Sequence, residues 1–191
     1  MSHTMERQTD AGLTRHLRDE AVRHLQHLLR CDTQSPPGNE RLAAEYIAGV
    51  LRDAGIAPEL LESAPGRASV VARLAARRPA GRPILLMGHI DVVTVEREQW
   101  ERDPFGGEIS EGFVWGRGAL DMKGQVAAEL AAFLHLARAG TPLTRDLIFV
   151  AFADEEAGGT YGADWVWKHH RDLIDAEFAI NEGGGTPIEI G

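Results

Sequence analysis

The sequence predicts an α/β protein of three layers, in which a central, largely parallel (mixed) sheet is flanked by helices. Two short runs, residues 84–87 and 147–152, are apolar at every position, which is typical of strands buried on both faces. Segments of helical period alternate with such runs along the chain, as they do in α/β folds. A chain of 191 residues, 43% hydrophobic and 26% charged, is long enough for one domain with its own core.

The first half of the chain supplies the first two helices and strands. Residues 1–12 are polar, and we expect a disordered N-terminus there. A Ser-Pro-Pro-Gly break separates the two helical segments, and Asn39 is expected to cap the second one. In chain order the expected elements are a helix over 13–29, a helix from Asn39 that stops at Gly55, strands over 56–62 and 69–75, an arginine-rich loop over 77–83 and the buried strand over 84–87.

The second half continues the alternation of helix and strand. Its longest helix is rich in alanine, begins at Met122 and is ended by Gly140. The expected elements are a loop over 100–107, a short strand over 113–115, the helix over 122–139, the buried strand over 147–152, a short helix over 163–170 and a third core strand over 177–180.

Composition excludes several classes of partner. The net charge of −9, from 20 basic and 29 acidic residues, argues against a nucleic-acid partner, which usually needs a basic face. The apolar runs are too short to cross a bilayer, and residues 1–30 lack the apolar core of a signal peptide. Cys31 is the single cysteine, so neither an internal disulfide nor a thiolate zinc cage can form. We therefore expect a cytoplasmic protein without membrane or nucleic-acid partners.

Side chains of the kind that bind metals follow three of the apolar strands, at the point where each strand ends. A further acid lies in a glycine-rich turn that opens a helix. In open α/β sheets the site lies outside the carboxyl ends of the strands, so these residues are expected to converge. They are His89 and Asp91, then Asp121 in the turn, then Glu155 and Glu156, then Glu182.

Each residue type suits a role in such a site. His89 can offer a neutral imidazole nitrogen to a metal, and Asp91 can hold its other ring nitrogen. The glycines around Asp121 let the backbone approach closely. Glu155 and Glu156 should diverge, so that one binds metal while the other acts as a general base. A carboxylate-rich set with one histidine suits zinc, cobalt or manganese.

Each of these residues taken singly has a plainer interpretation. A histidine after a strand is usually a polar residue at a sheet edge, and a Glu-Glu pair is usually a solvated turn. Four such places on one scaffold favour the functional interpretation. Nucleotide-binding and serine-hydrolase motifs are absent from the sequence: Asp121 stands where the dinucleotide fingerprint needs its third small residue, Lys123 lacks phosphate-loop spacing, and no Gly-x-Ser-x-Gly elbow occurs.

Taken in order, the motifs resemble those of the co-catalytic zinc exopeptidases, which include aminoacylase, acetylornithine deacetylase, succinyl-diaminopimelate desuccinylase and carboxypeptidase G. The resemblance covers nearly the whole chain from Leu13. It rests on Gly88-His89-Ile90-Asp91-Val92-Val93, Trp100 with Asp103-Pro104-Phe105, Trp115-Gly116-Arg117-Gly118 through Asp121-Met122-Lys123-Gly124, Asp154-Glu155-Glu156 and Asn181-Glu182-Gly183-Gly184.

The resemblance implies a role for each site residue. His89 and Glu182 would bind one metal, Glu156 the second, and Asp121 would bridge the two. Asp91 would orient His89, and Glu155 would take a proton from the water that attacks the amide carbonyl. The cofactors implied are two divalent metals, with zinc favoured over cobalt or manganese. A cis peptide is also expected between Asp121 and Met122.

The resemblance further implies a metal-dependent hydrolase that cleaves an amide bond of N-acyl amino acids or small peptides. Members of the family are longer: a lid domain follows the strand that ends near Glu182, and a late histidine completes the second metal site. Residues 13–191 are thus expected to be the N-terminal part of the catalytic domain, with a homodimer formed through the lid in the full-length protein. His169 and His170 precede Glu182 and are not expected to replace the late histidine. The alternative is a truncated or split lobe that folds and binds metal without catalysis.

Overall fold

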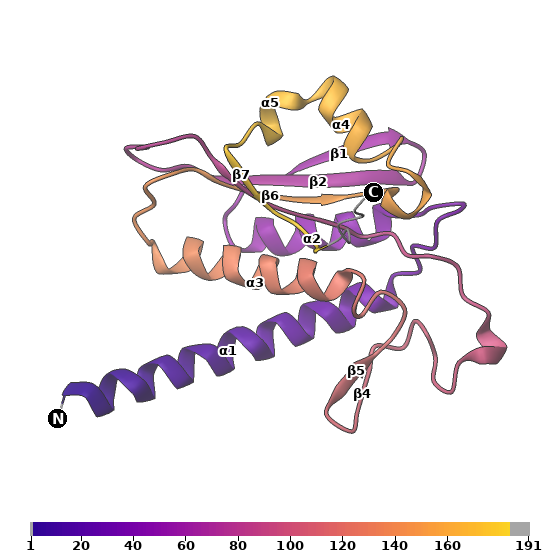
Figure 1. The fold of residues 1–191 in the computed structure, drawn as a ribbon, viewed down its shortest axis with the longest axis horizontal. Coiled ribbons are helices and arrows are strands. Elements are labelled where there is room, and N and C mark those ends of the chain that lie inside the picture. Colours follow the sequence, from indigo (N-terminus) through magenta and orange to yellow (C-terminus); the bar gives the residue numbers. More distant parts are fainter. Residues whose placement is uncertain (1, 184–191) are drawn as a thin grey trace, which may run out of the picture.

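A five-stranded mixed sheet forms the centre of the computed structural model, which describes the backbone of residues 2–183 and the side chains from residue 12 onward (Figure 1). The strand order is β1-β2-β6-β3-β7. β3 runs parallel to β6 and β7, whereas β1–β2 and β2–β6 are antiparallel, so the mixed α/β sheet predicted from the sequence is confirmed. The strands are β1 (Glu59–Ala64), β2 (Arg67–Leu74), β6 (Leu147–Phe152), β3 (Ile84–His89) and β7 (Phe178–Ile180).

Helices cover the sheet on both faces and complete the three layers (Figure 1). One core lies between the sheet and the helices α2 and α3, and α1 packs against α3 on the outside of that layer. A smaller core lies between the opposite face and the short helices α4 and α5. The helices are α1 (Ser2–Arg30), α2 (Arg41–Asp53), α3 (Lys123–Ala139), α4 (Ala163–His169) and α5 (Arg171–Ile174).

The central strand β6 explains why the sequence shows an unbroken apolar run there. All six of its residues are buried, because helices pack on both sides. Phe149 points to one face, where its ring lies 5.8 Å from that of Phe133 on α3. Ile148 points to the other face and packs in the core with Val166 of α4. A strand with one solvated face would instead alternate apolar and polar residues.

A small hairpin, β4 (Glu108–Ser110) with β5 (Phe113–Trp115), stands apart from the main sheet. Its first strand was not predicted. The hairpin turn places Glu111 and Gly112 at φ values of 55° and 84°, and successive positive φ values are typical of tight hairpin turns. Because such turns usually carry Asn-Gly or Asp-Gly, the Glu-Gly pair was a weak signal. Two 3₁₀ turns, η1 (Arg97–Gln99) and η2 (Glu155–Ala157), were also missed.

Three local expectations differ from the structure. β7 was predicted to be a core strand, and this is wrong for the part of the chain that the structure describes: β7 pairs there only with β3, and Phe178 and Ile180 are 57% and 53% exposed. Asn39 does not cap α2; Glu40 precedes the helix, and its carboxylate bonds Arg67 instead. The backbone of α1 is helical from Ser2, through the segment expected to be disordered, since extending a formed helix adds one hydrogen bond per residue.

Among the described residues, no helix combines the length and the hydropathy that crossing a membrane requires.

A candidate metal centre at the ends of the strands

Four segments that are far apart in sequence meet around the side chain of His89, the last residue of β3. Its Nε2 lies 3.1 Å from Asp121 Oδ1, 3.8 Å from Glu155 Oε2 and 4.0 Å from Glu182 Oε2. The structure thus brings together every metal-ligand candidate that the sequence singled out. Two overlapping groups have ligand atoms close enough to share an ion: His89 with Asp121 and Glu156, and His89 with Glu155 and Glu182.

The imidazole of His89 is held from behind by Asp91. Its Nδ1 lies 3.0 Å from the carbonyl oxygen of Asp91 and 3.3 Å from Oδ1 of the same residue. The ring is buried, and burial by itself lowers the pKa of His89. The hydrogen bond and charge of Asp91, with the charge of Glu155 and the hydrogen bond to Asp121, outweigh burial and raise that pKa to about 9. Nε2 therefore faces a strongly negative environment.

Asp91 also joins the histidine to the two adjacent glutamates. Its carboxylate is fully buried and accepts the backbone N–H of Glu155 on Oδ1 and that of Glu156 on Oδ2, each at 3.0 Å. One side chain thus orients His89 and fixes the start of η2. The sequence suggested only the contact of Asp91 with His89. The contact with the two N–H groups depends on β3 and β6 lying side by side.

The acids of the cluster destabilise one another's charged forms. Burial is the main cause that raises the pKa of Glu156, and the charges of Asp121 and Asp91 add to it. The pKa of Glu182 is raised in the same way, by burial first and then by the neighbouring acids. A bound cation would offset the electrostatic repulsion between the carboxylates that surround the imidazole. The donor set, one imidazole nitrogen and several carboxylate oxygens, fits zinc, cobalt or manganese.

The glycine-rich turn before α3 brings Asp121 to the cluster. Gly118 has φ +85°, and a Cβ there would lie 2.6 Å from Cγ1 of Val92, which lies in the segment directly after β3. A Cβ at Gly124 would overlap the carbonyl oxygen of Ala119. Only glycine allows this approach of the turn to the strand end. The Asp121–Met122 peptide is cis, as the resemblance implied.

Lys123 is a residue whose role the sequence did not reveal. Its side chain is fully buried, and Nζ donates hydrogen bonds to the carbonyl oxygens of Leu28 at 3.0 Å and Cys31 at 2.9 Å. These carbonyls lie at the end of α1, where the helix leaves acceptors unsatisfied. Burial lowers the pKa of Lys123 to about 8. The lysine thereby ties the start of α3, next to Asp121, to the end of α1.

Two cavities adjoin the cluster. One, of about 270 Å³, is lined by His89, Glu155 and Glu182 together with glycines of the loop after η2. The other, of about 550 Å³, is mostly apolar and runs from Asp121 along Leu120 to the hairpin.

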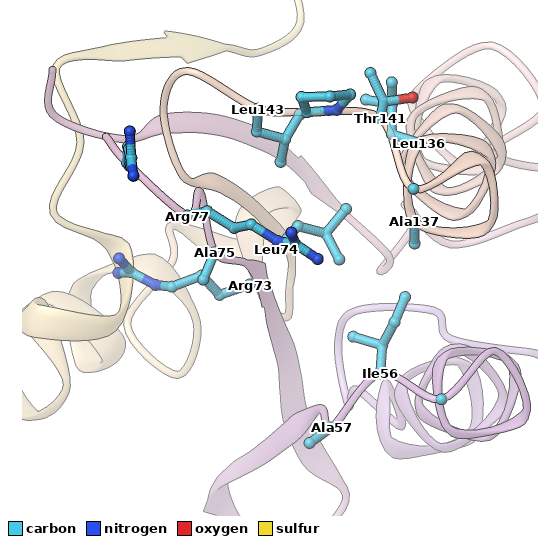
Figure 2. Close-up of a pocket in the computed structure, with 14 residues that line it drawn as sticks. Ile56, Ala57, Arg73, Leu74, Ala75, Arg77, Leu136, Ala137, Thr141 and Leu143 are labelled. Atoms are coloured by element: carbon cyan, nitrogen blue, oxygen red, sulfur yellow. The ribbon is translucent and has the colours of Figure 1, made fainter. Parts of the chain in front are cut away.

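A cavity larger than these two lies elsewhere. It has a volume of about 870 Å³ and opens between β2 and the C-terminal ends of α2 and α3, where the sticks of Ile56, Leu74, Leu136 and Arg77 surround it (Figure 2). Leu74 pairs with Leu147 at the beginning of β6, whereas the cluster lies at the end of that strand. No acid or histidine is among its lining residues, so this cavity offers no metal ligands.

Comparison with known proteins identifies the family. Residues 85–191 match peptidase family M20/M25/M40, which is more than half of the chain and contains all six candidate site residues. The chain belongs to this family. The resemblance inferred from the sequence motifs is thereby confirmed.

The relatives that the chain matches include a desuccinylase and an aminoacylase. The chain is 36% identical over 159 residues to succinyl-diaminopimelate desuccinylase of Methylobacterium radiotolerans, covering 78% of this chain and 39% of that protein. It is 33% identical over 163 residues to rat aminoacylase-1B, covering 84% of this chain and 40% of the relative.

Among solved structures, an M20-family metallo-carboxypeptidase from Sulfolobus solfataricus superposes with a TM-score of 0.71 at 27% identity. The match covers 87% of this chain and 38% of that one. The M20-family chain therefore spans about two fifths of the length of these relatives, and it shares their fold over that part.

Proposed function

We propose that the protein acts as a metal-dependent hydrolase that cleaves an amide bond of N-acyl amino acids or small peptides, as a deacylase or exopeptidase. The observation that carries the proposal is the convergence of His89 with carboxylates from three other segments at the ends of the strands. The names of its relatives, a desuccinylase, an aminoacylase and a metallo-carboxypeptidase, support this substrate class. Because the chain covers about two fifths of them, the activity is proposed for the full-length protein.

The proposed cofactors are two divalent metal ions, with zinc favoured and cobalt or manganese as alternatives. We assign His89 and Glu182 to one ion, Glu156 to the other and Asp121 to both. When bound, such ions polarise a carbonyl oxygen and lower the pKa of water. A divalent pair would also neutralise the carboxylates whose mutual repulsion raises the pKa of Glu156 and of Glu182, after the effect of burial.

Two residues are proposed to act without binding metal. The Glu155 carboxylate, whose side chain is 54% exposed, is assigned as the general base. It would take a proton from the attacking water as the water oxygen bonds to the amide carbon, and pass that proton to the nitrogen as the C–N bond breaks. Asp91 is assigned as the residue that keeps the proton of His89 on Nδ1, so that Nε2 presents its lone pair to the cluster.

The test is the metal content per chain after dialysis into zinc, with hydrolysis of a panel of N-acyl amino acids measured on the same sample and on the full-length protein. Zinc uptake with turnover in the full-length protein is the expected result. Absence of both would overturn the proposal. For the 191 residues alone, the second candidate is a lobe that binds metal without turnover, since His89 is the single histidine among the described residues that reaches the cluster.

A further inference from the structure

A buried network of charged side chains lies beside the candidate metal centre. Arg67 on β2 donates two hydrogen bonds to the Glu40 carboxylate, at 2.7 Å each, and one from Nη2 to Asp154 Oδ1 at 2.5 Å. The same nitrogen donates to Ser35 Oγ at 3.2 Å. The side chains of Glu40, Asp154 and Arg67 are 0%, 2% and 10% exposed. None of the three belongs to the groups that could hold a metal.

Asp154 organises the loop that carries two of the cluster's acids. It is the residue directly before Glu155, with φ +66°. Its Oδ2 accepts the backbone N–H of Tyr161 at 2.8 Å, and its carbonyl oxygen accepts that of Gly159 at 2.6 Å. The middle and the end of the loop over residues 155–162 are therefore hydrogen-bonded to one residue. Arg67 links Asp154 to β2 through its hydrogen bond. Its guanidinium also lies over the Tyr161 ring, 5.0 Å from the ring centroid.

Two glycines leave the space that this arrangement requires. A Cβ at Gly38 would overlap the guanidinium of Arg67, and a Cβ at Gly162 would overlap the carbonyl oxygen of Ala153 at the end of β6. The loop is thus seated directly against the strand end. Asp91 holds its beginning from the other side through the N–H groups of Glu155 and Glu156.

We propose that Arg67 is a positioning residue: its fork to Glu40 and Asp154 fixes the loop over residues 155–162 and thereby the placement of Glu155 and Glu156. The role of these glutamates rests on the proposed function. A guanidinium donates to two carboxylates from one rigid plane, whereas a lysine ammonium has three donors on a flexible stem and cannot reproduce the bidentate geometry. Arg67→Lys therefore keeps the buried positive charge and loses the fork.

Two measurements test the inference on the 191-residue chain. The first is backbone hydrogen exchange without metal, in which Arg67→Lys should speed exchange at the amides of Glu155, Glu156 and Tyr161 while β2 and β6 stay protected. The second is titration with Co²⁺ followed by its visible absorption, in which the variant should bind about 10–100-fold more weakly. The matched control is Arg73→Lys on the same strand, whose partner Asp146 lies away from the cluster. It should change neither measurement.

Asp154→Asn is the second variant, because it removes the loop's charged contact and leaves Arg67 in place. It should reproduce both effects, and the double variant should lose no more Co²⁺ affinity than Arg67→Lys alone, since both act through one contact. Wild-type exchange at the three amides, or unchanged Co²⁺ affinity, in both single variants would overturn the inference. Failure of the wild-type chain to bind Co²⁺ would instead overturn the proposed metal centre, and the exchange data would still decide whether Arg67 fixes the loop.

Discussion

At the scale of single residues, two neighbours in η2 illustrate how one backbone turn can separate two roles. Glu155 and Glu156 both donate their N–H groups to Asp91, yet their carboxylates join different groups around His89. Glu155 is the more exposed of the two. Their assignment as base and as ligand is testable because the same substitution at each position has a different expected result.

Glu155→Gln in the full-length protein should retain its metal and lose turnover by about 10²–10⁴-fold, since the base is removed while the ligands remain. Glu156→Gln should lose metal as well as turnover. Metal content by atomic emission and kcat on an N-acyl amino acid check both expectations. Loss of metal in Glu155→Gln would show that Glu155 is a ligand, as its grouping with His89 and Glu182 allows.

A second residue-scale prediction concerns Glu129 on α3, which is buried and whose Oε2 has no hydrogen-bond partner among the described residues. Burial raises its pKa from 4.5 to about 7, against the opposing effect of a hydrogen bond from Gln125. A carboxyl whose pKa is higher in the folded state contributes stability below about pH 4.5, and this is lost as the pH rises through about 7.

Glu129→Gln should therefore increase the free energy of unfolding at pH 8 relative to wild type, by on the order of 2–3 kcal/mol, and have little effect near pH 4.5. Urea unfolding at the two pH values measures the difference. An equal effect at both pH values would contradict the assignment of a raised pKa.

At the scale of elements, the site depends on loops that pack closely against the ends of the strands. The segment after β6 turns back at once, and α4 begins at Ala163 after a glycine that lies against the strand end. The turn before α3 approaches the segment after β3 in the same way. Such contacts leave no room for a Cβ. A Gly→Ala substitution should therefore destabilise the fold at a close contact of this kind, but not at a helical glycine with open space around it.

Gly162→Ala should destabilise the fold by about 1–3 kcal/mol or more, because its Cβ would overlap the Ala153 carbonyl oxygen. Gly49→Ala in α2 is the matched control, since nothing lies within 4 Å of a Cβ there and alanine favours helix; it should stabilise by about 0.5–1 kcal/mol. Thermal unfolding of both variants provides the comparison, and equal effects of the same sign would contradict the close seating of the loop.

At the scale of the whole molecule, the candidate ligands come from four segments that span residues 89–182. An ion held by them would connect the end of β3 with the turn before α3, with η2 and with the segment after β7. It would bind the folded chain and not the unfolded one, so metal should act on global stability.

Zinc at about 100 times its dissociation constant should raise the free energy of unfolding by about 2.7 kcal/mol, and the Tm by roughly 5–10 °C. Asp121→Ala removes the residue assigned to both ions and should abolish the shift. Differential scanning calorimetry with zinc, and with a chelator in its place, measures it. A shift of the same size in Asp121→Ala would place the bound zinc elsewhere.

The sequence by itself determined the α/β class, the buried strands and the six candidate site residues, because their signals are local. An unbroken apolar run marks a strand such as β6, and the glycines around Asp121 mark a tight turn. The tertiary structure decided which side chains meet. Asp91 reaches the N–H groups of η2 only because β3 and β6 are parallel neighbours, and Arg67 reaches Asp154 only because β2 lies on the other side of β6. The exposure of β7 is decided in the same way, since an apolar pattern does not tell an edge strand from a central one.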